Sequence, residues 1–342
     1  MSEQFNKGKQ LIVAIILGIL TYWLFAQSFL NIAPHVQRFY HVDMSIVNIA
    51  VSLTSLLTGV FIVVAGGLSD KILILLRGIP ESKDESAYNK KFDIVGIIIF
   101  VVMMLSINVV ITQGDRIGWL NPLILILIAI FIVTLIAFYI FEKRQDEPFI
   151  DLSLFSNNVY IGTTLANLMV NMDIGSLALF NIYVQDDKHL SAAQAGLITI
   201  PYMLCSLLMI RVGERFMQKR GPQLPLMLGP VSITVGIIYY IVACIGFIFI
   251  GLGLGFFATP ALSTAVSNVP SEKAGTASGI IKMTSTLGAA FGIAVVTTIY
   301  TALSVNHPAY LAATIAFIVG AGLVFIAFIA AYCLIPKKNV DI

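Results

Sequence analysis

The residue with the clearest chemical potential in this 342-residue sequence is Asp173, near the middle of an apolar run from Val159 to Val184. That run is long enough to cross a bilayer as a helix. A charge at the centre of a membrane helix costs about 2.5–3.5 kcal/mol on insertion scales, so it normally faces a protein interior or a water-filled path. We therefore predict that Asp173 takes up and releases a proton. The alternative is a carboxylate that only pairs with a neighbouring helix.

Other polar residues in the apolar runs predict a cavity for a small molecule. Asn167 and Asn171 are one helical turn apart and share a face with each other. They either bind a substrate or form hydrogen bonds between helices, and the sequence leaves both alternatives open. The first apolar run offers a second set, in which aromatic rings suit lipophilic cations but could equally pack against lipid or protein. These residues are Tyr22, Trp23, Gln27 and Asn31.

The composition restricts the class of protein. Hydrophobic residues make up 58% of the chain and charged residues 11%, against roughly 25% charged in soluble domains. The mean hydropathy is +0.94, so we expect an all-α polytopic membrane protein with the lipid bilayer as its surroundings. A net charge of +2 without a basic cluster gives no reason to expect a nucleic-acid partner. Neither the cysteines nor the histidines have metal-ligand spacing, so no metal or other cofactor is expected.

Runs of about 20 apolar residues without a charge are the expected membrane spans. They are Leu11–Ala33, Ser45–Leu68, Ile94–Thr112, Pro122–Phe141, Val159–Val184, Ala195–Ile210, Thr276–Ser304 and Ala309–Ile335. If the N-terminus is cytoplasmic, the inner loops hold most of the lysines and arginines, whereas the outer loops hold only Arg38, Arg116 and Lys188. This asymmetry predicts that both termini are cytoplasmic. We expect a monomer in the plasma membrane.

Two places interrupt this regular pattern. At Lys71–Ile72 an inner loop runs directly into a short apolar stub that belongs to no span. The apolar region Leu224–Ala258 needs an even number of crossings, because basic residues flank it on both sides, yet it is too short for two full ones. Either this region is a short hairpin, or residues are missing around Ile238–Tyr239.

Several motifs resemble those of one transporter family. Gly66-Gly-Leu-Ser-Asp70-Lys71 resembles the opening of the loop signature of the major facilitator superfamily, and Arg211-Val-Gly-Glu214-Arg215 resembles its repeat in the second half. Leu30-Asn31-Ile-Ala-Pro34 is similar to the end of the first helix in the fourteen-helix drug:proton antiporters of that superfamily. The glycine-rich stretches Gly251–Gly255 and Gly288–Gly292 resemble late helices of the same branch, where glycines allow helices to approach closely.

The resemblance implies a proton-coupled antiporter that exports lipophilic, often cationic or zwitterionic drugs by alternating access between two helical bundles. It implies a gating role for the loop-signature residues, which are Gly66, Asp70, Lys71, Arg211, Glu214 and Arg215. Many relatives have an aspartate in the first helix where this chain has Ala26. Asp173 therefore becomes the expected proton-coupling residue, and small-molecule drugs and protons become the expected partners.

The chain departs from the family pattern because helices expected after the loop signature are absent. We expect residues 1–71 to be a remnant of the N-terminal bundle and residues 72–93 to be a cytoplasmic linker. Residues 94–152 would form a central pair of extra helices, and residues 153–342 the C-terminal bundle. The alternatives to export are a metabolite uniporter or symporter and, if the chain is truly continuous, a membrane scaffold that transports nothing. We do not expect an enzyme, because no catalytic arrangement occurs at span depth.

Overall fold

The computed structural model describes residues 32–43, 46, 47, 49–51, 53, 54, 58, 93–145, 148–239, 243–270 and 273–337. Helices dominate this part of the chain, and it contains no strand. Seven of the helices within it are long and apolar enough to cross a membrane. The expected class, an all-α polytopic membrane protein, is confirmed. The orientation of the termini remains a prediction, and the first two expected spans lie largely outside the described residues.

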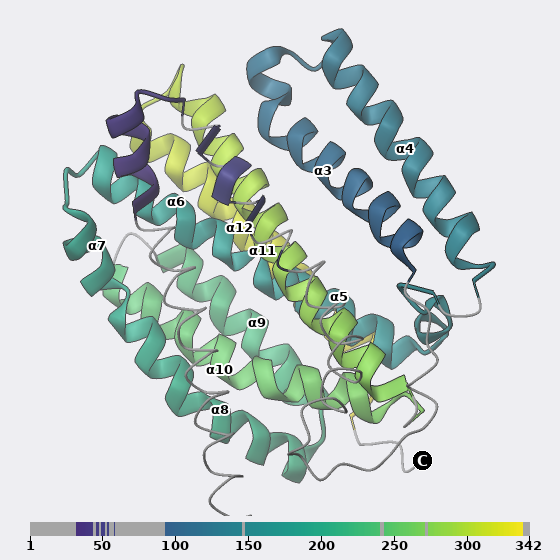
Figure 1. Ribbon diagram of the computed structural model, residues 1–342. Helices are drawn as coiled ribbons and strands as arrows, with labels where there is room; N and C mark the ends of the chain where they lie inside the picture. The colour runs from purple at the N-terminus through teal and green to yellow at the C-terminus, as the bar shows by residue number, and fades with distance from the viewer. Residues whose placement is uncertain are drawn as a thin grey trace, which may run out of the picture.

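Helices α3 (Ile94–Ile117) and α4 (Pro122–Glu142) form a hairpin beside the main bundle (Figure 1). Both begin at side-chain caps: Asp93 Oδ1 accepts from the Gly96 N–H at 2.8 Å, and Asn121 Oδ1 accepts from the Leu123 N–H at 2.9 Å. Such caps satisfy donors that the first turn of a helix leaves unpaired. The hairpin packs through α3 against α11 of the bundle.

The next span is a single apolar stretch that the structure divides at Met172. A short 3₁₀ helix, η2 (Leu152–Ser156), leads into α5 (Asn158–Asn171), and α6 (Asp173–Asp186) follows directly. The remaining elements run up and down around this span (Figure 1). They are α7 (Ala192–Ile198), α8 (Ile200–Arg220), α9 (Gln223–Ile238), α10 (Ala243–Ser267), α11 (Ala274–Ser304) and α12 (Ala309–Leu334).

The apolar region Leu224–Ala258 forms a helical hairpin whose two helices differ in length. Helix α9 has 16 residues and is about 24 Å long, less than the roughly 30 Å of a bilayer core. Helix α10 has 25 residues and is long enough to cross. The two helices touch at Gly236 and Gly246, where a side chain on either glycine would meet the backbone of the other helix at 2.6–2.7 Å.

Glycines in α10 and α11 bring neighbouring helices into backbone contact. A Cβ at Gly251 or Gly255 would collide with the backbone of α8 at Tyr202 or Ser206, and one at Gly253 would lie 2.5 Å from the Gly229 carbonyl oxygen of α9. A Cβ at Gly292 would collide with the Met172 carbonyl oxygen. These contacts confirm that the glycine-rich stretches allow close helix approach, because only hydrogen fits at these crossings.

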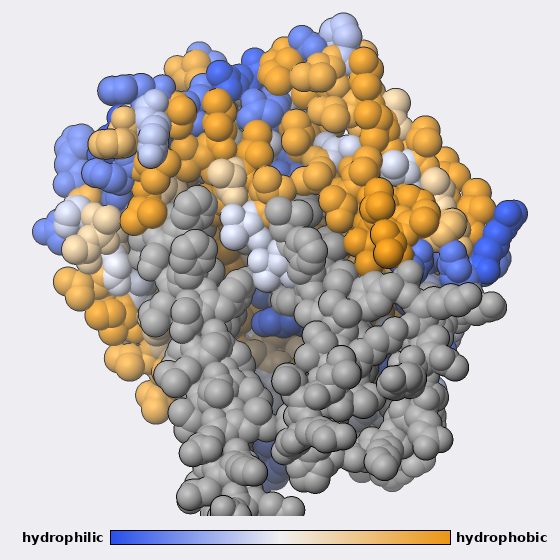
Figure 2. All heavy atoms as spheres, in the orientation of Figure 1, coloured by the Kyte–Doolittle hydropathy of each residue, from blue (hydrophilic) through white to orange (hydrophobic). Residues whose placement is uncertain are grey.

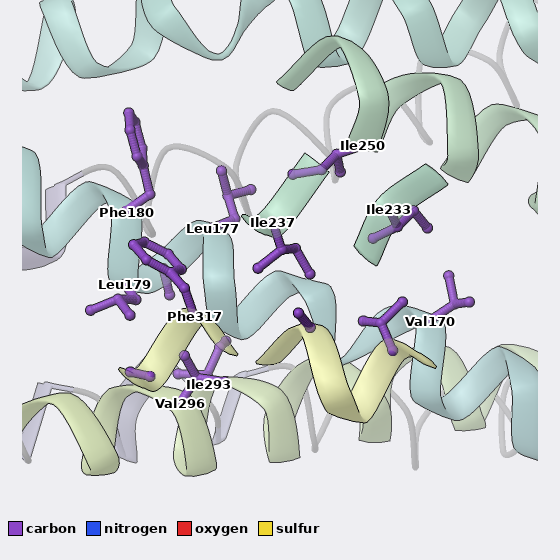
Figure 3. Close-up of a cluster of buried hydrophobic side chains, with 14 of the residues drawn as sticks. Val170, Leu177, Leu179, Phe180, Ile233, Ile237, Ile250, Ile293, Val296 and Phe317 are labelled. Carbon is purple, nitrogen blue, oxygen red and sulfur yellow. The ribbon is translucent and has the colours of Figure 1, made fainter. Parts of the chain in front are cut away.

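The main core lies among α5, α6, α9, α10, α11 and α12. Figure 3 shows Leu177 of α6 next to Ile237 of α9, and Phe317 of α12 near Leu179 of α6. The outer surface is also largely hydrophobic, and its hydrophilic residues gather at the edges (Figure 2). Helix α8, for example, leaves Leu208 74% exposed. An apolar exterior around an apolar core is expected of a protein surrounded by lipid.

Candidate proton site at the break between α5 and α6

Asp173 is the first residue of α6 and is buried, with 4% of its surface exposed. Its Oδ1 atom is buried and has no hydrogen-bond partner. The four ion pairs among the described residues do not involve it. A carboxyl oxygen buried without a hydrogen-bond partner is costly to charge. The role of Asp173 in proton coupling stays a prediction.

The break that positions Asp173 has a local cause in Asn171. The Asn171 Nδ2 donates to the Asn167 carbonyl oxygen at 2.7 Å, which is the acceptor that a regular helix gives to the Asn171 backbone. The next backbone bonds tighten to three-residue spacing, from the Met172 N–H to the Met169 oxygen and from the Gly175 N–H to the Met172 oxygen. Asp173 consequently lies at a one-residue irregularity in a helical span that otherwise runs from Asn158 to Asp186.

Two neighbouring helices fix the position of this break. On one face, Gly175 of α6 lies directly against the backbone of Gly292 in α11, with no room for a side chain. On another face, Tyr202 of α8 lies close enough to interact electrostatically with Asp173. The carboxyl group therefore lies inside the bundle, within electrostatic reach of Tyr202 of α8.

Asn167 is buried and bonded to α11. Its Nδ2 atom donates to the Ile281 carbonyl oxygen at 2.8 Å, to the Thr284 Oγ1 at 3.1 Å and to the Ser285 Oγ at 2.9 Å. Asn171 is half-buried and bonds only within its own helix. These contacts favour the interhelical alternative for Asn167. Lining of a substrate cavity by either residue stays a prediction.

Two further polar residues of this span, Ser176 and Asn181, are buried in α6. Asn181 is 1% exposed, and its Nδ2 donates to the Leu177 carbonyl oxygen at 3.0 Å, while its Oδ1 is buried without a partner. Ser176 Oγ is likewise buried and without a partner. Ser176 and Asn181 follow Asp173 by three and eight residues in the same apolar run. That pattern in the sequence could have indicated them, because polar groups at span depth rarely occur without a role.

Several predicted site residues lie outside the described part of the chain. They are Tyr22, Trp23, Gln27, Asn31, Gly66, Asp70 and Lys71. Arg211, Glu214 and Arg215 are described and lie in the second half of α8. Unlike Asp173, all three are exposed. Between them, Gly213 lets α8 touch the backbone of Phe256 in α10. Among the described residues, no group of three or more His, Cys, Asp or Glu side chains is arranged to hold a metal.

Long apolar helices and a lipid-compatible surface together define a multi-pass membrane protein, and this one has a buried carboxyl group inside its bundle. Comparison with protein families then identifies the chain. The Major Facilitator Superfamily matches residues 92–293 and, in a second match, 163–341, and the chain belongs to that family. It is therefore a multi-pass protein of the plasma membrane in a family of transporters, not of enzymes.

Several curated relatives share one name. The chain is 32% identical to the "Quinolone resistance protein NorB" of Staphylococcus aureus strain Newman over 453 residues, which cover 98% of each protein. The same protein of strain USA300 matches equally, and that of strain JH9 is 31% identical over the same coverage. The match extends over 453 residues although this chain has only 342, so the relatives contain internal segments that it lacks. This agrees with the two irregular places in the sequence.

Proposed function

We propose that the protein is a proton-coupled exporter of lipophilic drugs, often cationic or zwitterionic, that works by alternating access. The observation that carries the proposal is the burial of Asp173 at a helix break without a hydrogen bond to Oδ1. Relatives of 32% identity bear the name of a quinolone resistance protein, and quinolones are drugs of this kind. In this proposal, proton binding at Asp173 drives the exchange of proton for drug.

The remaining roles follow from this proposal. Asn167 and Asn171 would line the drug cavity together with Tyr22, Trp23, Gln27 and Asn31. The cytoplasmic loop signatures would control gating through Gly66, Asp70, Lys71, Arg211, Glu214 and Arg215. Both termini would be cytoplasmic, with residues 94–152 as a central helix pair between a short N-terminal remnant and the C-terminal bundle. The protein would act as a monomer.

The test is drug transport by the full chain in proteoliposomes with an imposed proton gradient. We expect gradient-driven transport in the wild type and at least a tenfold loss in Asp173→Asn, because the amide cannot exchange a proton. Drug binding without a gradient should persist in that variant. The matched control is Asp187→Asn, since Asp187 follows the end of α6 and pairs there with Lys188 at 2.9 Å. Full gradient-driven transport by Asp173→Asn would exclude Asp173 from proton coupling.

A second candidate function is a membrane scaffold that does not transport. It is favoured by one observation, namely that the chain lacks segments present in its relatives. The two candidates differ in the same proteoliposomes. If the wild-type chain binds quinolones but moves none under any gradient, the scaffold function replaces export.

A further inference from the structure

Two carboxyl groups meet at the open end of the α3–α4 hairpin, that of the half-buried Asp93 and that of the buried Glu142. Asp93 caps α3 with Oδ1, while its Oδ2 is buried and has no hydrogen-bond partner. Glu142 is the last residue of α4 and is 2% exposed, and its Oε1 is likewise buried without a partner. The sequence analysis assigned no role to either residue, and export as proposed above does not use them.

Gly96 is the reason that these two groups can face each other. A Cβ at Gly96 would lie 2.7 Å from Glu142 Oε1 and would collide with Asp93 Oδ2. Both oxygens therefore point at the space that a side chain would fill, from opposite helices of the hairpin. A glycine at this position leaves that space for the two carboxyl groups.

No described basic residue neutralises the pair. Lys143 follows Glu142, but its Nζ lies over the Tyr139 ring at 6.0 Å from the centroid, and Arg144 is exposed. On the adjoining loop, Asp151 is paired with Lys273 of α11 at 2.7 Å. The nearby charged residues that lie outside the described part of the chain are Lys90, Lys91, Asp146 and Glu147.

Two carboxylates in one buried space repel each other and lose their hydration, so one of them holds a proton in the stable state. We propose that Asp93 and Glu142 form a second proton-binding site, in which one proton is shared between Asp93 Oδ2 and Glu142 Oε1. The shared proton joins the first turn of α3 to the last turn of α4. Loss of the proton leaves two facing charges and separates these helix ends.

The site is connected to the bundle through the loop after α4. Glu142 Oε2 accepts from the Ile150 N–H at 3.4 Å, and the Phe149 ring packs on Phe100 of α3 at 5.5 Å between centroids. The next residue, Asp151, forms the ion pair with Lys273, which caps α11. The pair is therefore linked to the loop that holds the hairpin to the beginning of α11, and the Ile150 N–H of that loop favours the charged form of Glu142. With the orientation proposed above, this end faces the cytoplasm and responds to cytoplasmic pH.

The test uses the purified full chain in lipid nanodiscs, titrated from about pH 5 to about pH 9. Infrared spectroscopy detects the carbonyl band of a protonated carboxylic acid, and thermal denaturation reports stability. In the wild type we expect a protonated-acid band that disappears as pH rises, together with a fall of about 2–4 °C in melting temperature. A group protonated in the folded state contributes stability at low pH and loses it as the proton leaves.

Variants separate the pair from other acids. Glu142→Gln should remove the part of the band that Asp173→Asn leaves in place and should flatten the pH dependence, whereas the control Asp187→Asn should retain both. Asp93→Asn keeps a capping oxygen and should shift the titration of Glu142 to lower pH, because the negative neighbour is gone. Asp173→Asn should leave this titration unchanged, so the result does not depend on the export function.

Three outcomes would overturn the shared proton. The first is a band and pH slope in Glu142→Gln equal to those of the wild type. The second is an unchanged titration in Asp93→Asn, which also decides the question if Glu142→Gln fails to fold. The third is stabilisation by added Ca²⁺ or Mg²⁺ without any pH dependence, which would make the pair a cation site.

Discussion

The two halves of the broken span, α5 and α6, differ in how their polar groups are satisfied. In α5, the Asn167 side chain has three acceptors on α11, and the Tyr160 O–H donates to the Ala277 carbonyl oxygen at 3.2 Å. In α6, oxygens of Asp173, Ser176 and Asn181 are buried without partners, whereas α5 has one such oxygen, Thr164 Oγ1. Both halves have 14 residues, and α6 is the more deeply buried of the two.

The difference separates polar groups that hold helices together from polar groups kept for another purpose. A satisfied amide such as that of Asn167 contributes to packing, because its hydrogen bonds replace those it would make with water. An unpaired carboxyl group such as that of Asp173 weakens packing, so its presence requires a functional reason. If this interpretation is correct, substitutions in α5 change stability and substitutions of Asp173 change transport.

The largest effect is expected where Gly292 of α11 crosses the junction between α5 and α6. Gly292→Val should destabilise the protein by about 3 kcal/mol or more, because the added side chain meets the backbone of Met172, which cannot rotate away. Thermal denaturation in detergent measures the change. The control is Gly279→Val in the same helix, where an added Cβ has nothing within 4 Å. Equal stability of the two variants would mean that α11 does not cross α6 at this point.

A smaller effect is expected from removing the α5 amide. Asn167→Ala should lower stability by about 1–2 kcal/mol, because hydrogen bonds between membrane helices average about 0.6 kcal/mol each and Asn167 makes several. Gradient-driven drug transport, measured per folded molecule, should fall in this variant only to the extent that Asn167 also lines the drug cavity. The comparison between α5 and α6 fails if Asn167→Ala keeps full stability but abolishes transport.

The smallest effect concerns the ion pair before α5. Burial by itself would raise the pKa of Asp151, but hydrogen bonds from Lys273 and Ser153 outweigh it and hold that pKa below its usual range. A lowered carboxyl pKa contributes stability above the ordinary range near pH 4 and loses it as pH falls through the lowered value. Because Lys273 is 40% exposed, Asp151→Asn should cost only about 0.2–1 kcal/mol.

Melting temperatures of the wild type and of Asp151→Asn should therefore differ slightly at neutral pH and converge in acid. The control is Asp187→Asn, which removes a similar exposed pair elsewhere. A difference that grows as pH falls would show that the ion pair has the opposite linkage and that its pKa is not lowered.

Much of the helical architecture could be predicted because it depends on local sequence. Pro122–Phe141 was expected as a span, and α4 covers Pro122–Glu142, since a continuous apolar run in lipid has to satisfy its backbone internally. The break at Met172 was not predicted. It depends on the Asn171 side chain and on the contact with Gly292, which is 120 residues later in the chain.

The candidate sites show the same division. Asp173 could be recognised from the sequence alone, because a charged residue inside an apolar run is evident without knowledge of the fold. The partners of Asn167 on α11 and the meeting of Asp93 with Glu142 could not, because each joins residues of different helices. Helix periodicity specifies which residues share a face, but not which other helix that face contacts.

The sequence by itself determined that this is a membrane protein of many helices with an acid at span depth, because hydropathy and charge are properties of single segments. The tertiary structure alone decided that the acid has no cationic partner among the described residues and that a nearby asparagine is satisfied. It also decided that two further acids face each other over Gly96. The physical reason is that hydrogen bonding and charge pairing depend on distances of a few ångströms between helices, which glycine contacts set and segment composition does not.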